Sequence, residues 1–468
     1  MRRTKIIVTV GPASEKPQIL ERLIKAGMDV ARLNFSHGSH QEHIQRIQLI
    51  RKIAQKLDRP ITIIQDLQGP KVRVATLPNN QITLKEGTIV TLTPAERYPS
   101  QPDTIPIDYS GLAGDVAPGM RILMDDGLLE LNVIAVDPPN VKARVVRGGI
   151  LKSRKSVNVP DAPLNLPSVT QKDLSDLEVG IKCKVDYIAL SFVRDVNDLR
   201  NLRTILAAKG SSIPIIAKIE KPQALNHLRE IIEESDAVMV ARGDLGVELS
   251  PERVPIAQKQ IIKLCNQVGK PVITATQMLE SMVSNPVPTR AETSDVANAI
   301  MDGTDAIMLS AETSIGQYPV EAVKMMDRIA RQIEAIAEFK TYPPSQFTPT
   351  HALCESVRTI EEIIKPVCIV LYTISGFTAK ILSAERTKTH ILAITPSQKV
   401  YHTLNLVWGV TPVYIDKIAS GFDELIAFAE DLARKIVGAK PGDKILVLGG
   451  VPTGIPQNTN FIKIHSLQ

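Results

Sequence analysis

The chain has 468 residues, which is long for one domain and favours roughly two to four domains. Its hydrophobic fraction of 44% and charged fraction of 22% are typical of a globular protein with a sizeable core. A net charge of +5 and an aromatic fraction of 4% argue against a nucleic-acid surface. No apolar run is long enough to span a membrane or to form a signal-peptide core, so we expect no membrane contact and a cytoplasmic location. The four scattered cysteines are expected to be reduced thiols.

Eight short runs rich in valine and isoleucine predict strands, most of them separated by amphipathic helical segments. The runs are Lys5–Val10, Asp29–Ser36, Ile61–Leu67, Asp186–Phe192, Ile213–Glu220, Asp236–Gly243, Pro271–Gln277 and Asp305–Glu312. Apolar strands that alternate with helices predict an α/β fold with a parallel sheet, and eight such units predict a closed (β/α)₈ TIM barrel. Nearly every run begins apolar and ends polar. Since barrel enzymes place their chemistry at the C-terminal ends of the strands, this asymmetry favours an enzyme.

The alternation of strands and helices is interrupted twice. Between residues 69 and 160, segments of alternating polarity with turn signals such as Asp126-Gly127 predict an inserted antiparallel β-barrel domain that acts as a lid. The proline-rich stretch Tyr342–Pro349 ends the first α/β pattern, and a second one with an open, mostly parallel sheet follows it. Its strands are predicted near Val367–Tyr372, His390–Thr395, Thr411–Ile415 and Lys444–Leu448. We therefore expect a discontinuous catalytic barrel (1–68 and 161–340), a lid (69–160) and a C-terminal α/β regulatory domain (341–468).

Polar side chains are concentrated at the predicted strand ends. Residues two apart on a strand point to the same side, so several of these groups should project together from the barrel mouth. They are Arg32, Asn34, Ser36, Asp66, Lys218, Glu220, Asp244, Thr274 and Thr276. Two cations and three acids at one mouth suit phosphoryl transfer, because acids hold a divalent cation and cations neutralise phosphoryl oxygens. Taken singly, a strand-end arginine or the pair Lys218 and Glu220 is more often a salt bridge than a site.

Several longer segments resemble sequence blocks of the pyruvate kinase family. They are Asp29–Ser39, Gln65–Arg73, Ile216–Pro222, Val238–Glu248, Thr274–Met282 and Pro288–Thr313. The resemblance extends over nearly the whole chain in the family's order, including the inserted and C-terminal domains. It implies a glycolytic phosphotransferase that moves the phosphoryl group of phosphoenolpyruvate to ADP, giving pyruvate and ATP.

The resemblance also implies roles for individual residues. Glu220 and Asp244 would bind Mg²⁺ or Mn²⁺, which bridges enolpyruvate and phosphate in the family. Lys218 would stabilise the phosphoryl group in flight and the enolate, a task that suits a compact ammonium, and Arg32 would hold the phosphate of phosphoenolpyruvate. The positions that reach the nucleotide in the family correspond to Asn34, His37, Arg73 and Lys155.

Further substrate contacts are implied at the ends of three more strands. Backbone amides of Arg242-Gly243-Asp244, which open a helix, would take the substrate carboxylate, as helix N-termini favour anions. Thr276 would position the substrate where the enolate becomes pyruvate. The sequence does not identify the final proton donor, although Ser310 and Glu312 fit a water relay.

Two positions depart from the usual family pattern. The monovalent-cation site of the family uses Asn, Ser, Asp and Thr ligands, and here Asn34, Ser36 and Asp66 remain while Leu67 offers no hydroxyl. Lys71 stands where most members have a glutamate. We hypothesise that the Lys71 ammonium replaces K⁺, so that activity requires Mg²⁺ but not K⁺.

The C-terminal domain contains a loop that resembles the effector phosphate loop of the family. Hydroxyls and free backbone amides suit a phosphorylated metabolite, and the candidate residues are Thr373, Ser375, Gly376 and Thr378. The alternative is a helix N-cap without a ligand. The resemblance therefore implies allosteric control by an effector that the sequence does not identify, in an enzyme that is a homotetramer in most of the family.

Two other functions compete with the kinase. A metal-dependent lyase or aldolase acting on phosphoenolpyruvate or pyruvate would explain Glu220 and Asp244, but it would not need Lys218 with Arg32 or a lid carrying Lys155. A catalytically silent paralogue is favoured only by Leu67 and Lys71, since the main catalytic positions are intact.

Overall fold

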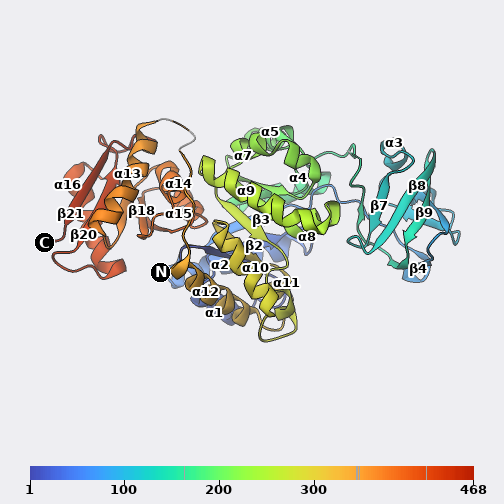
Figure 1. Cartoon of the computed structure of the whole chain (residues 1–468), viewed down its shortest axis with the longest axis horizontal. Coiled ribbons are helices and arrows are strands. Elements are labelled where there is room, and N and C mark those ends of the chain that lie inside the picture. Colours follow the sequence, from blue (N-terminus) through green and yellow to red (C-terminus); the bar gives the residue numbers. More distant parts are fainter. Residues whose placement is uncertain (163, 344–345, 347, 418) are drawn as a thin grey trace.

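The computed structural model describes residues 1–162, 164–343, 346, 348–417 and 419–468. A central barrel lies between two smaller domains, one at each end of an elongated molecule (Figure 1). Three residues of the predicted proline-rich linker, 344, 345 and 347, lie outside the described part. No helix of the described part is long and apolar enough to cross a membrane.

Eight parallel strands close the barrel in the order β1-β16-β15-β14-β13-β12-β3-β2. They are β1 (Lys5–Thr9), β2 (Val30–Asn34), β3 (Thr62–Asp66), β12 (Tyr187–Leu190), β13 (Ile215–Ile219), β14 (Ala237–Ala241), β15 (Val272–Ala275) and β16 (Ala306–Leu309). The predicted TIM barrel is confirmed, and its strands are shorter than predicted. Some polar residues of the predicted runs, such as Glu220 and Thr276, directly follow the observed strands at the mouth.

Helices surround the barrel and bury its outer face. They are α1 (Pro17–Ala26), α2 (His40–Lys56), α4 (Gln171–Lys182), α5 (Val196–Ala208), α6 (Pro222–Asn226), α7 (Leu228–Glu234), α8 (Arg242–Glu248), α9 (Val254–Val268), α10 (Arg290–Met301), α11 (Ala311–Ser314) and α12 (Pro319–Ile336). Helix α2 begins at a capping box in which the Ser39 side chain accepts the Glu42 N–H and Glu42 accepts the Ser39 N–H. The main core lies between strands and helices, and a second core fills the barrel interior, where Leu406 of the C-terminal domain joins residues such as Ile64 and Met239.

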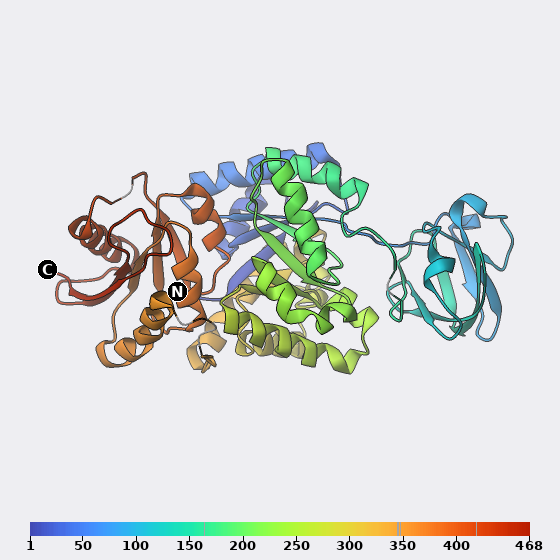
Figure 2. The same ribbon diagram turned by 90° about the horizontal axis from the view of Figure 1, so that it is seen from above.

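The lid lies at the mouth end of the barrel and is joined to it by two chain crossings (Figure 2). It contains β4 (Gln81–Leu84), β5 (Ile89–Pro94), β6 (Thr104–Ile107), α3 (Leu112–Asp115), β7 (Arg121–Met124), β8 (Leu129–Asp137), β9 (Asn140–Arg147), β10 (Gly149–Lys152) and β11 (Val157–Asn158). Its sheet has the order β11-β7-β8-β9-β5-β6 and is antiparallel except between β5 and β6. The segment 72–75 hydrogen-bonds to residues beside β11 and to β6, for example from Val74 N–H to the Lys155 carbonyl and from Ala75 N–H to the Pro106 carbonyl. This segment therefore closes the sheet into the predicted barrel.

The C-terminal domain lies at the opposite end of the barrel. It contains α13 (Pro349–Ile364), β17 (Ile369–Tyr372), α14 (Phe377–Ala384), β18 (Ile391–Thr395), α15 (Gln398–Leu404), β19 (Val410–Tyr414), α16 (Phe422–Leu432), β20 (Lys444–Gly449) and β21 (Phe461–Ser466). The sheet order is β19-β18-β17-β20-β21, with β21 antiparallel to β20. The open, mostly parallel sheet is as predicted, whereas the edge strand β21 was not anticipated.

Candidate active site

Four charged side chains meet at the C-terminal mouth of the barrel. Lys218 on β13 lies 2.9 Å from Glu220 and 3.1 Å from Asp66, measured from its Nζ to the carboxylate oxygens. Arg32 on β2 donates from Nε to the other oxygen of Asp66 at 2.6 Å. Asn34 pairs with Asp66 in the register of β2 and β3, so these strand ends are adjacent. The sequence-based expectation that Arg32, Asp66, Lys218 and Glu220 converge is confirmed.

The site is buried, so its charges interact strongly. Glu220 and Asp66 are each 1% exposed and Lys218 is 8% exposed. Burial raises the pKa of an isolated carboxyl, but the Lys218 and Arg32 charges outweigh that effect and lower the pKa of Asp66. Burial opposes the charged form of Lys218, yet Asp66 and Glu220 outweigh it and raise the pKa of this ammonium. Lys218 is therefore a permanent cation at neutral pH.

Asp244 contributes a third carboxylate from the first turn of α8. Burial raises the pKa of Glu220 and the nearby Asp244 charge raises it further, while Lys218 acts in the opposite direction. No group of three or more His, Cys, Asp or Glu in the described residues forms a complete protein cage for a metal. Two adjacent carboxylates are nevertheless the usual protein contribution to a Mg²⁺ site that is completed by substrate phosphates and water.

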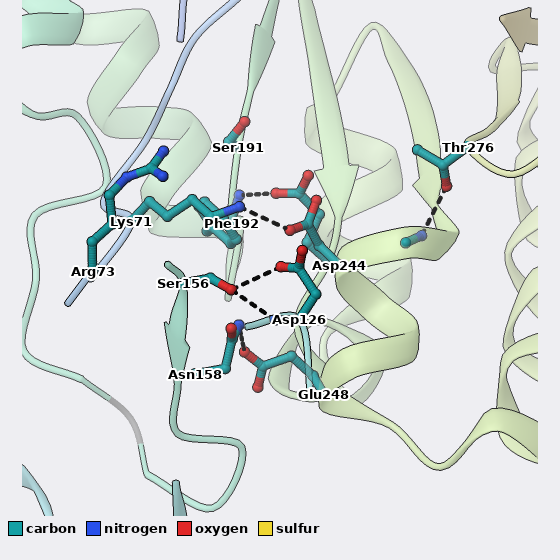
Figure 3. A network of polar contacts seen from close by, with 12 residues as sticks. Lys71, Arg73, Asp126, Ser156, Asn158, Ser191, Phe192, Asp244, Glu248 and Thr276 are labelled. Atoms are coloured by element: carbon teal, nitrogen blue, oxygen red, sulfur yellow. Dashed lines mark hydrogen bonds and ion pairs between the residues drawn. The ribbon is translucent and has the colours of Figure 1, made fainter. Parts of the chain in front are cut away.

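Lys71 reaches the same carboxylate. Its Nζ lies 3.5 Å from Asp244 Oδ1, and Figure 3 shows the lysine extending from the base of the lid toward the mouth. Asp66, a candidate ligand of the monovalent-cation site, is paired with Arg32 and Lys218. The Asn34 side chain accepts the Ser36 N–H at 3.1 Å. Lys71 therefore adds its charge beside Asp244.

Three residues beside this mouth have left-handed backbone. Phe192, Thr276 and Gln277 have φ values of 56°, 69° and 52°, which are costly for residues with a Cβ and most of all for a β-branched one. Two of these strained residues make hydrogen bonds at the site. Phe192 N–H donates to Glu220 Oε2 at 2.7 Å, and Thr276 Oγ1 accepts the Gly243 N–H at 2.8 Å (Figure 3). The turn that follows β12 thus holds Glu220, and the turn that follows β15 holds the start of α8.

The comparisons with known proteins agree with this geometry. A family model described as "Pyruvate kinase, barrel domain" matches residues 1–323, and one described as "Pyruvate kinase, alpha/beta domain" matches residues 351–465. The chain belongs to the pyruvate kinase family. A pyruvate kinase of Geobacillus stearothermophilus is 46% identical over 472 residues, which cover 99% of this chain and 80% of that protein. One from Staphylococcus aureus is 45% identical over the same shares. A crystal structure of a pyruvate kinase from Cryptosporidium parvum matches with a TM-score of 0.94 at 34% identity, covering 100% of this chain and 96% of the other.

Within the pyruvate kinase family the chemistry is phosphoryl transfer from phosphoenolpyruvate to ADP, and this chain is a phosphotransferase of that kind. The candidate nucleotide residues lie at the edge of the mouth. Arg73 and Lys155 are neighbours at the base of the lid, where Arg73 bridges to Ser156. Lys155 lies 2.8 Å from Asp125, and His37 is exposed at the end of β2.

The remaining candidates have specific partners. The Arg242 guanidinium pairs with Asp295 at 2.8 Å and donates to the Thr276 carbonyl at 2.7 Å. Both carboxylate oxygens of Glu312 accept backbone N–H groups, from Leu279 and Ser310. The Ser310 hydroxyl is buried, with no hydrogen-bond partner among the described residues.

The candidate effector loop joins β17 to α14. Thr373 Oγ1 accepts the Gly376 N–H at 3.0 Å, and Gly376 has a φ of 80° that the turn requires. The Thr378 hydroxyl hydrogen-bonds to Thr459 at 2.6 Å, and Ser375 is exposed.

Sequence reasoning missed three groups that support the central charges. Thr9 Oγ1 accepts from Arg32 at 3.0 Å, Ser191 Oγ accepts from Lys218 at 2.6 Å, and the Phe192 amide holds Glu220. Thr9 and Ser191 are polar residues at strand ends and could have been found by the rule that found the others. A backbone amide has no signature in the sequence.

Proposed function

We propose that phosphoenolpyruvate binds at the barrel mouth with its phosphate against Arg32 and Lys218, and that ADP binds between the mouth and the lid. The observation that supports this most is the buried group of Lys218, Asp66, Glu220 and Arg32. Glu220 and Asp244 would hold Mg²⁺ or Mn²⁺, which supplies charge neutralisation at the transferring phosphoryl oxygens.

The phosphoryl group passes in line from the enol oxygen of phosphoenolpyruvate to a β-phosphate oxygen of ADP. The bond between phosphorus and the enol oxygen breaks as the bond to ADP forms. Lys218 neutralises the charge on the phosphoryl oxygens during transfer and then faces the enolate. Amides at the start of α8, beside Gly243 and Thr276, orient the substrate carboxylate.

The enolate then takes a proton at carbon to give pyruvate. Ser310 offers a hydroxyl at the end of β16, and Glu312 fixes the turn that carries it through two backbone hydrogen bonds. We assign Ser310 to a proton relay through water and Glu312 to positioning. His37, Arg73 and Lys155, with Asn34 behind them, would contact the nucleotide, and the lid (69–160) would exclude water from the barrel (1–68 and 161–340).

We further propose that the enzyme does not require K⁺. The Leu67 side chain is 1% exposed and offers no oxygen ligand, while Lys71 brings a positive charge to Asp244. The family also favours a cytoplasmic homotetramer whose C-terminal domain (341–468) binds a phosphorylated effector at Thr373–Thr378. Light scattering tests the assembly, and a thermal-shift panel of sugar phosphates tests the effector loop.

The decisive experiment is a lactate-dehydrogenase-coupled assay with phosphoenolpyruvate, ADP and Mg²⁺, in K⁺ or in tetramethylammonium at equal ionic strength. Pyruvate formation in both salts supports the kinase and the role of Lys71. Activity in K⁺ alone retains the kinase and removes the role of Lys71. The Lys71→Glu variant is expected to be active only with K⁺. If no pyruvate forms in either salt, even with sugar phosphates added, the result would favour the lyase or the catalytically silent paralogue.

A further inference from the structure

A buried polar contact joins the lid to the barrel near the proposed metal ligands Glu220 and Asp244. Asn158 is the last residue of β11, and its Nδ2 donates to Glu248 Oε1 at 2.8 Å (Figure 3). The Lys221 ammonium pairs with the same oxygen of Glu248. Asn158 is 9% exposed and Glu248 is 4% exposed, so the contact is shielded from water. We call Asn158, Lys221 and Glu248 the hinge triad.

The two barrel members of the triad are chain neighbours of the proposed metal ligands. Lys221 directly follows Glu220. Glu248 ends α8, four residues after Asp244, so the two side chains lie on the same face of the helix, one turn apart. The third member, Asn158, belongs to the lid strand from which the chain returns to the barrel. One lid side chain therefore hydrogen-bonds to Glu248, and the same Glu248 oxygen is paired with the residue that follows Glu220.

The contact is also sensitive to the position of the lid. Both donors share Glu248 Oε1, while Oε2 is buried without a hydrogen-bond partner among the described residues. A buried carboxylate that loses a donor loses a charge-assisted hydrogen bond and cannot easily replace it with water. Lys221 and Glu248 are therefore best held together when Asn158 is in place.

A second contact extends the triad to Glu220 itself. The Lys221 Nζ lies 5.9 Å from the centre of the Phe192 ring. The Phe192 N–H is the donor that holds Glu220 Oε2, and Phe192 has left-handed backbone. A shift of Lys221 would act on Glu220 both through the adjacent peptide and through the turn at Phe192.

We propose that the hinge triad makes metal binding and lid position interdependent, with Asn158, Lys221 and Glu248 as positioning residues for the divalent cation. The inference rests on the proposed function, since it takes Glu220 and Asp244 as the metal ligands. When Asn158 is seated, Glu248 and Lys221 would hold in place the two chain segments that carry Glu220 and Asp244, the residues that would bind the cation. By reciprocity, the bound cation favours the seated lid.

The test is the affinity of the full-length protein for Mn²⁺ alone, measured from the electron paramagnetic resonance signal of free Mn²⁺. Asn158→Ala is expected to weaken Mn²⁺ binding about tenfold, as expected when a residue behind a metal ligand is removed. The matched control is Asn132→Ala, because Asn132 is a half-buried lid asparagine whose amide donates to the Gly119 carbonyl at 3.1 Å, away from the barrel. The control is expected to keep the wild-type affinity.

Steady-state kinetics give a second readout. Asn158→Ala should raise the KM for Mg²⁺ and leave kcat at saturating Mg²⁺ within a factor of about three. Glu248→Gln keeps the shape of the triad, removes the charge facing Lys221 and should weaken Mn²⁺ binding in the same direction. If Asn158→Ala shows no cooperative thermal transition and is therefore not folded, Glu248→Gln replaces it as the test variant.

The outcomes separate this inference from the proposed function. Wild-type Mn²⁺ affinity in folded Asn158→Ala or Glu248→Gln would overturn the inference and leave the kinase intact. An equal loss in Asn132→Ala would also overturn it, because the effect would then belong to the lid as a whole. A wild-type protein that neither binds Mn²⁺ nor forms pyruvate would instead contradict the proposed function.

Discussion

The two domains attached to the barrel are joined to it in different ways. At the bottom, the C-terminal domain inserts Leu406 into the barrel interior, and Asn405 donates to the carbonyls of Asp29 and Pro60 at 2.7 Å each. At the mouth, the contacts between lid and barrel include two polar ones, Asn158 with Glu248 and Lys71 with Asp244. Apolar burial resists separation, whereas a small set of polar contacts can exchange with water.

The contact between the barrel and the C-terminal domain, which we call the bottom junction, also contains a buried ion pair. Arg386 is 6% exposed and pairs with Asp305 at 2.9 Å, just before β16 begins. Trp408, the only tryptophan of the chain, lies between two guanidinium groups, 4.8 Å from that of Arg386 and 5.2 Å from that of Arg3. From these contacts we predict that the C-terminal domain and the barrel move as one body and that the lid moves relative to both.

The largest expected effect comes from breaking the bottom junction. Arg386→Met leaves Asp305 buried without its partner and should destabilise the junction by about 3–5 kcal/mol. The control Arg358→Ala removes a half-exposed guanidinium that lies 4.0 Å from Glu385 and should cost less than about 1 kcal/mol. Urea denaturation followed by Trp408 emission measures both. Equal midpoints for the two variants would contradict the rigid junction.

Acid should weaken the same junction. Burial lowers the pKa of His402 to about 4, helped by Arg51, and lowers the pKa of His390 to about 3, helped by Lys5 and Arg3. Both imidazoles are neutral when folded, so their stabilisation is complete above the unfolded pKa of about 6.5 and is lost as the pH falls toward the folded values. Between pH 7.5 and 5.0 the Tm should fall by on the order of 5 °C.

Calorimetry of the His402→Gln variant separates this effect from general acid destabilisation. The variant lacks the buried imidazole, so its Tm should fall less than that of the wild type over the same pH range. A parallel fall in both proteins would assign the pH dependence to other groups.

Closing the lid is expected to have the smallest effect on the bottom junction. Addition of ADP and Mg²⁺ should leave Trp408 emission unchanged, because the bottom junction does not take part in closure. Tryptic cleavage at Arg154, which is exposed between β10 and β11, should slow under the same conditions. A shift of Trp408 emission together with protection of Arg154 would show that both junctions move.

Much of the fold could be predicted from the sequence because apolar strands and amphipathic helices alternate regularly. The strand ends were less predictable: Glu220 and Phe192 continue the strand pattern in sequence, but their backbone turns out of the sheet to form the mouth. The edge strand β21 was missed because its six residues are only partly buried or exposed, and its apolar residues are interrupted by Lys463 and His465.

The site was predictable where charged residues end strands, as with Arg32 and Lys218. It was not predictable where the contact depends on tertiary structure alone. Asn158 and Glu248 are 90 positions apart, and neither ends a barrel strand. The partner of Lys71 also depends on the position of the lid base, which brings the lysine to Asp244.

The most direct test of the account is the coupled assay on Lys218→Met beside Lys209→Met, a control that removes a surface lysine paired with Glu178. Loss of the Lys218 charge should lower kcat for pyruvate formation by at least about a thousandfold, since this ammonium neutralises the transferring phosphoryl group. The control should keep wild-type kcat, and thermal melting should show both variants folded. A folded Lys218→Met enzyme with kcat within about tenfold of wild type would contradict the assignment of phosphoryl transfer to this site.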